Sequence, residues 1–254
     1  MNLPDLWDVA AIVRAAGDLV MSVYARDFDV HTKSDASPVT EADERAEALI
    51  VTALRALAPD IPVVAEEMSA RGEADAISRG GRFWLVDPLD GTKEFVSRNG
   101  EFTVNIALIE QGRPLLGVVG APAVGRLYAG VVGQGAWLED ASGRRPIRAV
   151  AAPADGLRVV ASRSHGDGAA LDRFLQPYRV ARVVNAGSSL KLCMMAAGEA
   201  DLYPRLGRTM EWDIAAGHAV LAAAGGSVRQ LDGSPFVYGK PGFENPHFVA
   251  RGIT

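Results

Sequence analysis

The residues between Arg82 and Arg148 constrain the fold most, because they form a run of short β-strands with little room for crossovers. Six apolar stretches are separated by Gly, Pro and polar residues: "RFWLV", "FTVNIALIE", "PLLGVVGAP", "RLYAGVVG", "GAWLE" and "PIRAV". Successive strands with short connections pair antiparallel, whereas parallel neighbours need a long crossover. We therefore expect an antiparallel sheet in the first half of the chain.

The flanking segments follow other patterns. Residues 5–26 carry apolar side chains at helical spacing, and "TEADERAEALIVTALRALAP" repeats this pattern from Thr40, so two amphipathic helices precede the sheet. After "AAPADG", predicted strands alternate with predicted helices: "LRVVAS", residues 169–178, "ARVVNA", "SLKLCMMAAG", "DLYPR", "DIAAGHAVLAAAGG" and "SVRQL". We place a boundary near residue 152, between an α+β half at 1–152 and an α/β half at 153–254 that completes the functional site.

Composition excludes several classes of protein. The chain has 254 residues, a net charge of -5 and no long Lys/Arg run, which argues against binding to polymeric nucleic acid. Its single cysteine, Cys193, excludes an intrachain disulfide, and no apolar run is long enough to span a bilayer. The first residues lack the pattern of a signal peptide. We expect a cytoplasmic monomer or homodimer, and loose association with the inner face of the cell membrane stays open.

The stretch "WLVDPLDGTKEF" points to chemistry. Asp87 and Asp90 follow an apolar run, and their spacing in a turn can direct both carboxylates, with the Leu89 carbonyl, at one point. Gly91 gives the backbone freedom to turn, and Thr92 adds a hydroxyl. Oxygen ligands of this kind suit Mg²⁺. The alternative is an ordinary Asp-Gly turn.

Further acids end other elements. "VVAEEMS" ends an apolar run with Glu66 and Glu67, and Asp213 stands at the start of a predicted helix. Each has a structural alternative, since Glu66 can be a surface acid and Asp213 can cap its helix. If these carboxylates converge, they need cations to offset their mutual repulsion.

The motifs "DPLDGTKEF", "NGEFTVNIALIE", "EE", "SRSH", "GSSLK" and "WDIAAGHAVLAAAGG", in this order over nearly the whole chain, resemble the inositol monophosphatase superfamily. Within it, they are most similar to the CysQ-type 3'(2'),5'-bisphosphate nucleotidases. The resemblance implies a layered α/β/α/β/α sandwich. It also implies Mg²⁺-dependent release of the 3'-phosphate of adenosine 3',5'-bisphosphate, giving AMP and phosphate in connection with sulfate assimilation, and inhibition by Li⁺.

The resemblance also implies roles for individual residues. The metal ligands are Glu66, Asp87, Asp90, Asp213 and the Leu89 carbonyl, holding two or three Mg²⁺ ions; of the Glu66-Glu67 pair, the family pattern favours the first. Glu66 belongs to the catalytic group together with Thr92, which positions the attacking water, and Asp43, which holds or deprotonates Thr92. The nucleotide contacts are His165, Ser188, Lys191 and Arg205.

Several of these roles have alternatives in the sequence itself. Asp43 follows Thr40 at the spacing of a capping box, so it can simply cap a helix. Lys191 and Arg205 suit a second phosphate but can equally be solvated surface charges. Backbone N–H groups of Gly91 and Thr92 can bind phosphate oxygens if "TKEFV" begins a helical turn.

The function as a whole also has alternatives. One is a phosphatase acting on inositol monophosphate or fructose 1,6-bisphosphate. The other is a non-catalytic, metal-dependent regulatory protein, which the presence of every ligand acid and of Thr92 disfavours.

Overall fold

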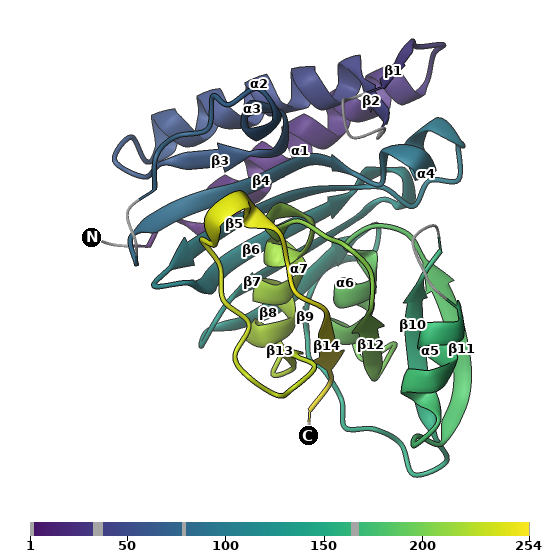
Figure 1. Cartoon of the computed structure of the whole chain (residues 1–254). Coiled ribbons are helices and arrows are strands. Elements are labelled where there is room, and N and C mark those ends of the chain that lie inside the picture. The colour runs from purple at the N-terminus through teal and green to yellow at the C-terminus, as the bar shows by residue number, and fades with distance from the viewer. Residues whose placement is uncertain (1–2, 33–37, 78–79, 164–167, 254) are drawn as a thin grey trace.

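The computed structural model describes residues 3–32, 38–77, 80–163 and 168–253, with only the main chain at residue 32. Helices alternate with two main sheets in layers, as Figure 1 shows. The α-helices are α1 Leu6–Tyr24, α2 Glu41–Leu57, α3 Glu66–Ala70, α4 Thr92–Val96, α5 Gly168–Leu175, α6 Leu190–Ala196 and α7 Glu211–Ala223, with 3-10 turns η1 Pro122–Val124 and η2 Pro241–Phe243. The layered sandwich expected from the sequence is confirmed.

The first main sheet has seven strands in sequence order, from β3 to β9. Strand β3 is parallel to β4, and every later neighbour is antiparallel. The strands are β3 Val63–Ala65, β4 Arg82–Asp90, β5 Thr103–Glu110, β6 Arg113–Ala121, β7 Arg126–Val131, β8 Gly135–Asp140 and β9 Gly143–Ile147. The antiparallel sheet predicted for the first half of the chain is confirmed.

The last of these strands was predicted in the wrong place. The expected strand "PIRAV" would run to Val150, but β9 ends at Ile147. The Ala149 N–H donates to the Ala224 carbonyl at the end of α7, so this part of the backbone is already paired outside the sheet. A contact between distant segments therefore ends the strand.

The second main sheet has five strands in the order β11-β10-β12-β14-β13. Its strands are β10 Leu157–Ser162, β11 Val180–Ala186, β12 Leu202–Arg205, β13 Ser227–Gln230 and β14 Phe248–Arg251. Strands β11, β10 and β12 are parallel, whereas β14 pairs antiparallel with β12 and β13. The sequence reading missed β14 and a small hairpin of β1 Val30–Thr32 with β2 Pro38–Thr40.

Two apolar layers hold the fold together. Helices α1 and α2 cover one face of the seven-stranded sheet, with Val13, Ile50 and Trp84 fully buried between them. Helices α6 and α7 lie between the two sheets, where residues of both halves of the chain share one core. That core contains residues from before and after residue 152. The boundary proposed there from the sequence stays a prediction.

Glycines let α7 approach the seven-stranded sheet closely. A Cβ built on Gly117 of β6 would lie 2.4 Å from the Ala216 carbonyl oxygen, and one on Gly130 of β7 would lie 2.9 Å from the Ala223 Cβ. Those distances are shorter than van der Waals contact. Because these two positions have no side chain, α7 can pack directly against the strands. The first turn of α7 carries Asp213.

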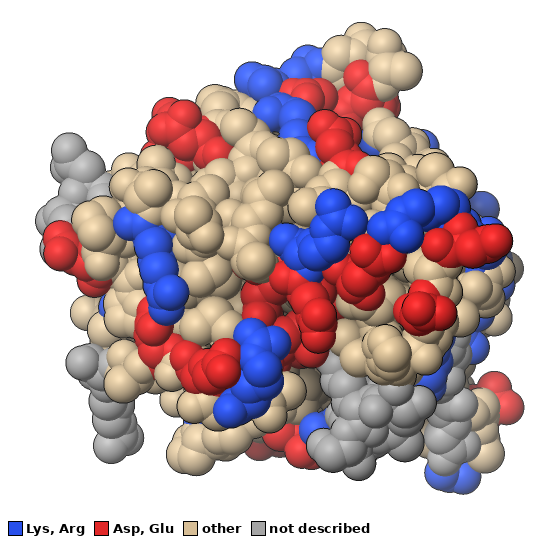
Figure 2. All heavy atoms as spheres, turned by 90° about the horizontal axis from the view of Figure 1, so that it is seen from above, with Lys and Arg blue, Asp and Glu red and all other residues tan. Residues whose placement is uncertain are grey.

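The outer face above α1 and α2 carries charge of both signs. Figure 2 shows Lys and Arg side chains interspersed with Asp and Glu on this face. Some of them pair, such as Arg26 and Arg45 with Glu41 at 2.7 and 3.3 Å. None of the helices that the structure describes is long and apolar enough to cross a membrane.

Candidate active site

A β-bulge forms the acidic turn at the end of β4. Strand β4 continues through Pro88 to Asp90. Asp87 pairs with Asn105 and Asp90 with Thr103, so β4 takes three steps where β5 takes two. One extra residue bends the strand and redirects its side chains. As a result Asp87, Leu89 and Asp90 all line one cavity.

Gly91 makes the turn that follows. Its φ is +90°, in the left-handed region that favours glycine, and a Cβ there would lie 3.2 Å from the Glu101 carbonyl oxygen. The next residues form the short helix α4, so the predicted helical turn at "TKEFV" is present. Binding of phosphate oxygens by the Gly91 and Thr92 N–H groups stays a prediction.

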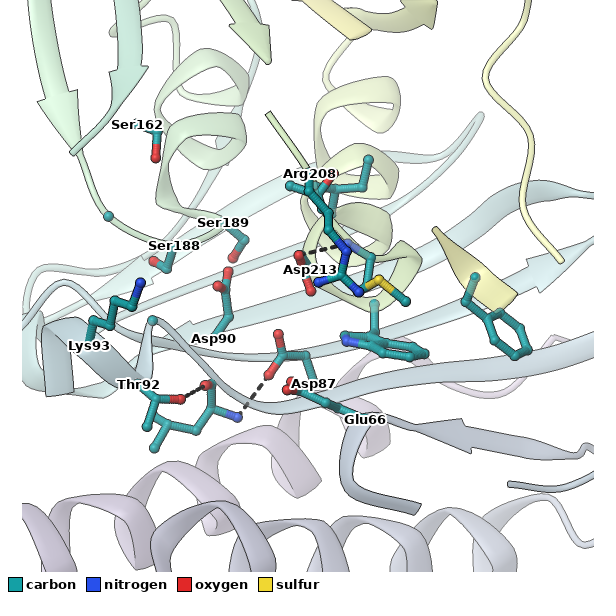
Figure 3. A pocket seen from close by; sticks show the side chains of 18 of the residues that line it. Glu66, Asp87, Asp90, Thr92, Lys93, Ser162, Ser188, Ser189, Arg208 and Asp213 are labelled. Carbon is teal, nitrogen blue, oxygen red and sulfur yellow. Dashed lines mark hydrogen bonds between the residues drawn. The ribbon is translucent and has the colours of Figure 1, made fainter. Parts of the chain in front are cut away.

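The acidic side chains named from the sequence come together around the cavity, which has a volume of about 860 Å³. Glu66 comes from the start of α3, Asp87 and Asp90 from β4, and Asp213 from α7, and Figure 3 shows them facing a common space. Glu67 is buried beside Glu66, and its N–H donates to Glu47 at 2.7 Å. Glu66 is therefore the member of the pair that lines the cavity.

The shared environment makes ionisation of these carboxyls unfavourable. Burial, followed by the nearby charges of Glu66, Asp90 and Asp213, raises the pKa of Asp87 well above its usual range. Burial also raises the pKa of Asp90 to about 6, although Lys191 opposes the shift. For Asp213 the pKa is raised by burial and then by Asp90 and Glu66. A bound cation would relieve this repulsion.

The donor set fits a hard divalent ion, since it consists of carboxylates and the Leu89 carbonyl. Within the described ranges, no three Asp, Glu, His or Cys side chains lie close enough together to hold one ion by themselves. Mg²⁺ usually takes only one or two carboxylates and keeps several waters. The carboxylates therefore suit ions that share ligands and leave positions open for a phosphate.

Asp43 has both roles that the sequence left open. Its Oδ2 accepts from the Thr40 N–H and hydroxyl, each at 2.8 Å, in the capping box of α2. Its Oδ1 lies 3.2 Å from Thr92 Oγ1 and accepts from that hydroxyl. Thr92 Oγ1 also lies 3.2 Å from the Leu89 carbonyl. One carboxylate thus caps a helix and contacts the cavity threonine.

Lys191 and Arg205 are buried, 4% and 7% exposed, so the alternative that they are solvated surface charges is wrong. Both line the cavity. The Lys191 ammonium donates to the Ala186 carbonyl at 3.0 Å and the Ser188 carbonyl at 2.5 Å. Burial lowers the pKa of Lys191 to about 8. Arg205 donates from one terminal nitrogen to the Arg208 carbonyl, while its Nε has no partner within the described residues.

The remaining predicted nucleotide contacts divide into two cases. Ser188 lines the cavity and has a left-handed φ of +46°, which is unusual for a residue other than glycine. His165 lies outside the described residues.

Other cavity residues had no role in the sequence reading. Trp212, Arg208 and Phe243 line the wall near α7, and Ser162 and Ser189 line the wall near β10 and α6. A usable signal existed for Ser189, which belongs to "GSSLK". Its hydrogen-bond partner Asn105, which does not line the cavity, stands out as a polar residue within the apolar run of β5. Both are buried.

Comparisons with known proteins find relatives over nearly the whole chain. The profile of the inositol monophosphatase family matches residues 6–250. A protein of Escherichia coli O157:H7 named 3'(2'),5'-bisphosphate nucleotidase CysQ is 49% identical over 94% of this chain and 96% of its own. A protein of Salmonella typhimurium with the same name is 47% identical, covering 96% of this chain and 98% of its own.

A solved structure of a member of the same family has a similar fold. CysQ from Bacteroides thetaiotaomicron, described as a bacterial member of the inositol monophosphatase family, matches with a TM-score of 0.81 at 34% identity. The match covers 98% of this chain and 97% of that one. Family profile, sequence relatives and fold agree over nearly the whole length, and the chain belongs to the inositol monophosphatase family.

Proposed function

We propose that this protein hydrolyses the 3'-phosphate of adenosine 3',5'-bisphosphate, releasing AMP and inorganic phosphate. Enzymes of the inositol monophosphatase family are metal-dependent phosphatases. The relatives that match over nearly the whole chain are named 3'(2'),5'-bisphosphate nucleotidases. Their name supports the choice of substrate for this chain.

The observation that carries the proposal is that one cavity combines the four carboxylates proposed as metal ligands with two buried cations. The carboxylates would hold metal ions that bind one phosphate. The two buried cations would bind a second phosphate. The Arg205 Nε supports this reading, because a buried donor without a partner is costly unless a ligand satisfies it. Adenosine 3',5'-bisphosphate has both phosphates on one nucleoside.

The metal ions in this proposal are two or three Mg²⁺, held by Glu66, Asp87, Asp90, Asp213 and the Leu89 carbonyl. When bound, Mg²⁺ supplies positive charge for the phosphate oxygens and lowers the pKa of water. The chain's own contribution is a set of fixed oxygen ligands from β4, α3 and α7.

Thr92 and Asp43 act on the attacking water. With its hydroxyl proton donated to Asp43 Oδ1, the Thr92 oxygen presents a lone pair that can accept a proton from water. The Asp43 carboxylate is held in place by Thr40, so it can take up the threonine proton without changing its orientation. A bond then forms between the water oxygen and phosphorus as the bond to the 3'-oxygen breaks. The leaving 3'-oxygen takes up a proton from solvent water, and Asp43 releases to solvent the proton that it accepted.

The other phosphate binds beside the buried cations of the cavity. We assign it to Lys191 and Arg205, with Ser188 and His165 as further nucleotide contacts and with Gly91 and Thr92 near the reacting phosphate. Arg205 offers a planar fork and Lys191 a compact charge. We also propose that the protein acts in the cytoplasm as a monomer or homodimer, on a small phosphorylated substrate and not on polymeric nucleic acid.

The test is phosphate release from adenosine 3',5'-bisphosphate, inositol 1-phosphate and fructose 1,6-bisphosphate, each with Mg²⁺ and with EDTA. We expect Mg²⁺-dependent turnover with the highest kcat/KM for the nucleotide. A preference for inositol 1-phosphate or fructose 1,6-bisphosphate would replace the substrate assignment. No turnover of any of the three would favour a non-catalytic, metal-dependent protein.

A further inference from the structure

Asp90 and the loop at 186–189 come from distant parts of the chain and meet at the cavity. Asp90 ends β4 in the first sheet, and the loop joins β11 to α6 on the second. In the proposed function Asp90 is a metal ligand, and Ser188 in this loop contacts the nucleotide. Figure 3 shows Ser188 and Ser189 on the side of the cavity that Asp90 faces.

Ser189 connects the two. Its hydroxyl lies 2.8 Å from Asn105 Oδ1 and 2.9 Å from Thr103 Oγ1, both on β5. Asn105 Nδ2 in turn lies 3.5 Å from Asp90 Oδ2. The Ser189 side chain therefore reaches Asp90 through Asn105.

The bridge is buried. Thr103, Asn105 and Ser189 are 0%, 1% and 4% exposed. Water therefore does not readily replace these hydrogen bonds, and losing one partner leaves another polar group unsatisfied. Buried networks of this kind hold their members in a single arrangement.

The loop itself is held in an unfavourable conformation. Ser188 has a φ of +46°, and left-handed backbone is unfavourable at a residue other than glycine. Besides Ser189, two contacts oppose this cost: Gly187 N–H donates to Glu101 at 2.7 Å, and the Lys191 ammonium donates to the Ser188 carbonyl. The Ser189 side chain is linked to Asp90 by hydrogen bonds through Asn105, whereas Lys191 acts on Asp90 by its charge.

We propose that Ser189 and Asn105 are positioning residues that join Asp90 to the 186–189 loop, so that binding of Mg²⁺ and binding of the 5'-phosphate side of the nucleotide favour each other. This inference rests on the proposed function. A metal ion that fixes the Asp90 carboxylate also fixes Ser189 and the strained Ser188. A nucleotide that orders the loop fixes Asp90 in return, since coupling between two binding sites is reciprocal.

The test uses 3'-deoxyadenosine 5'-monophosphate, which has a 5'-phosphate but no 3'-oxygen that could contact the metal ions. Its Kd is measured by calorimetry with saturating Mg²⁺ and with EDTA, and the ratio of the two values gives the coupling. For the wild-type protein we expect binding about tenfold tighter with Mg²⁺, within the usual range for coupled sites. For Ser189→Ala and for Asn105→Leu we expect a ratio below about twofold.

Thr103→Val is the matched control. It is nearly isosteric and removes a contact to the same Ser189 hydroxyl. It leaves in place the main-chain pairing of Thr103 with Asp90 and the contact of Asn105 with Asp90, so the Mg²⁺ ratio should stay at the wild-type value. A wild-type ratio near one would overturn the proposal. So would a wild-type ratio in either bridge variant, or an equal loss of coupling in Thr103→Val. The two bridge variants change different residues of the same hydrogen-bond network. The test can therefore be made with either variant that folds.

Turnover of adenosine 3',5'-bisphosphate by the same wild-type preparation separates the two claims. Mg²⁺-coupled binding of the monophosphate without such turnover would refute the proposed substrate and support the coupling. Turnover with unchanged coupling in the bridge variants would refute the coupling and support the proposed function.

Discussion

Buried His218 should make this protein lose stability as the pH falls below neutrality. The imidazole lies on α7, with Nδ1 2.8 Å from the Tyr238 hydroxyl and with Phe236 and Tyr238 packed around it. Burial lowers the pKa of His218 from its ordinary 6.5 to about 3. The folded state therefore resists a proton that the unfolded chain accepts readily.

The sign and size follow from linkage. Since the unfolded chain binds the proton first, the contribution of His218 to stability is present above pH 6.5 and is lost progressively as the pH falls from about 6.5 to about 3. One pKa unit corresponds to about 1.4 kcal/mol. At pH 5, about 1.5 units below the unfolded pKa, the loss is therefore about 2 kcal/mol.

The assay compares the wild-type protein with His218→Gln by urea unfolding at pH 7 and pH 5, followed by tryptophan fluorescence. Glutamine can keep a hydrogen bond to Tyr238 but does not titrate. The many carboxyls of the chain titrate in both proteins and cancel in the comparison. The wild type should lose about 2 kcal/mol more than the variant between the two pH values. Equal losses would show that His218 is not held neutral by burial.

Three further predictions concern the site and the core. Asp43→Asn should keep the helix cap but lower kcat by about 100-fold or more with little change in KM, as expected for loss of a proton acceptor; full turnover at saturating Mg²⁺ would remove Asp43 from the mechanism. Arg205→Met should raise KM for adenosine 3',5'-bisphosphate by about tenfold or more but hardly affect 3'-AMP, which lacks the second phosphate; an equal effect on both would refute the assignment. Gly117→Ala should destabilise the protein by about 1–3 kcal/mol, because its Cβ would meet the Ala216 carbonyl oxygen, and an unchanged melting temperature would contradict the close packing of α7.

Local patterns in the sequence determined much of the fold. Periodicity located α1, α2 and strands β4 to β8, because each depends on which face of a segment is apolar. The acids Glu66, Asp87, Asp90 and Asp213 could be named as candidates because they stand where such patterns end. The position of β9 and the existence of β14 could not be predicted in the same way, because the Ala149–Ala224 contact and the pairing of β14 with β12 and β13 join distant segments.

The tertiary structure decided which alternatives hold at the site. Sequence spacing allowed Asp43 to be a cap or a partner of Thr92, and only the approach of α4 to α2 shows that its two oxygens do both. Lys191 and Arg205 looked equally suited to the surface, and packing between the two sheets buries them. The bridge from Ser189 through Asn105 to Asp90 spans 99 residues of sequence, from 90 to 189. Local conformational preferences act only between residues that are near neighbours in the sequence. Packing of the core is therefore what brings these groups together.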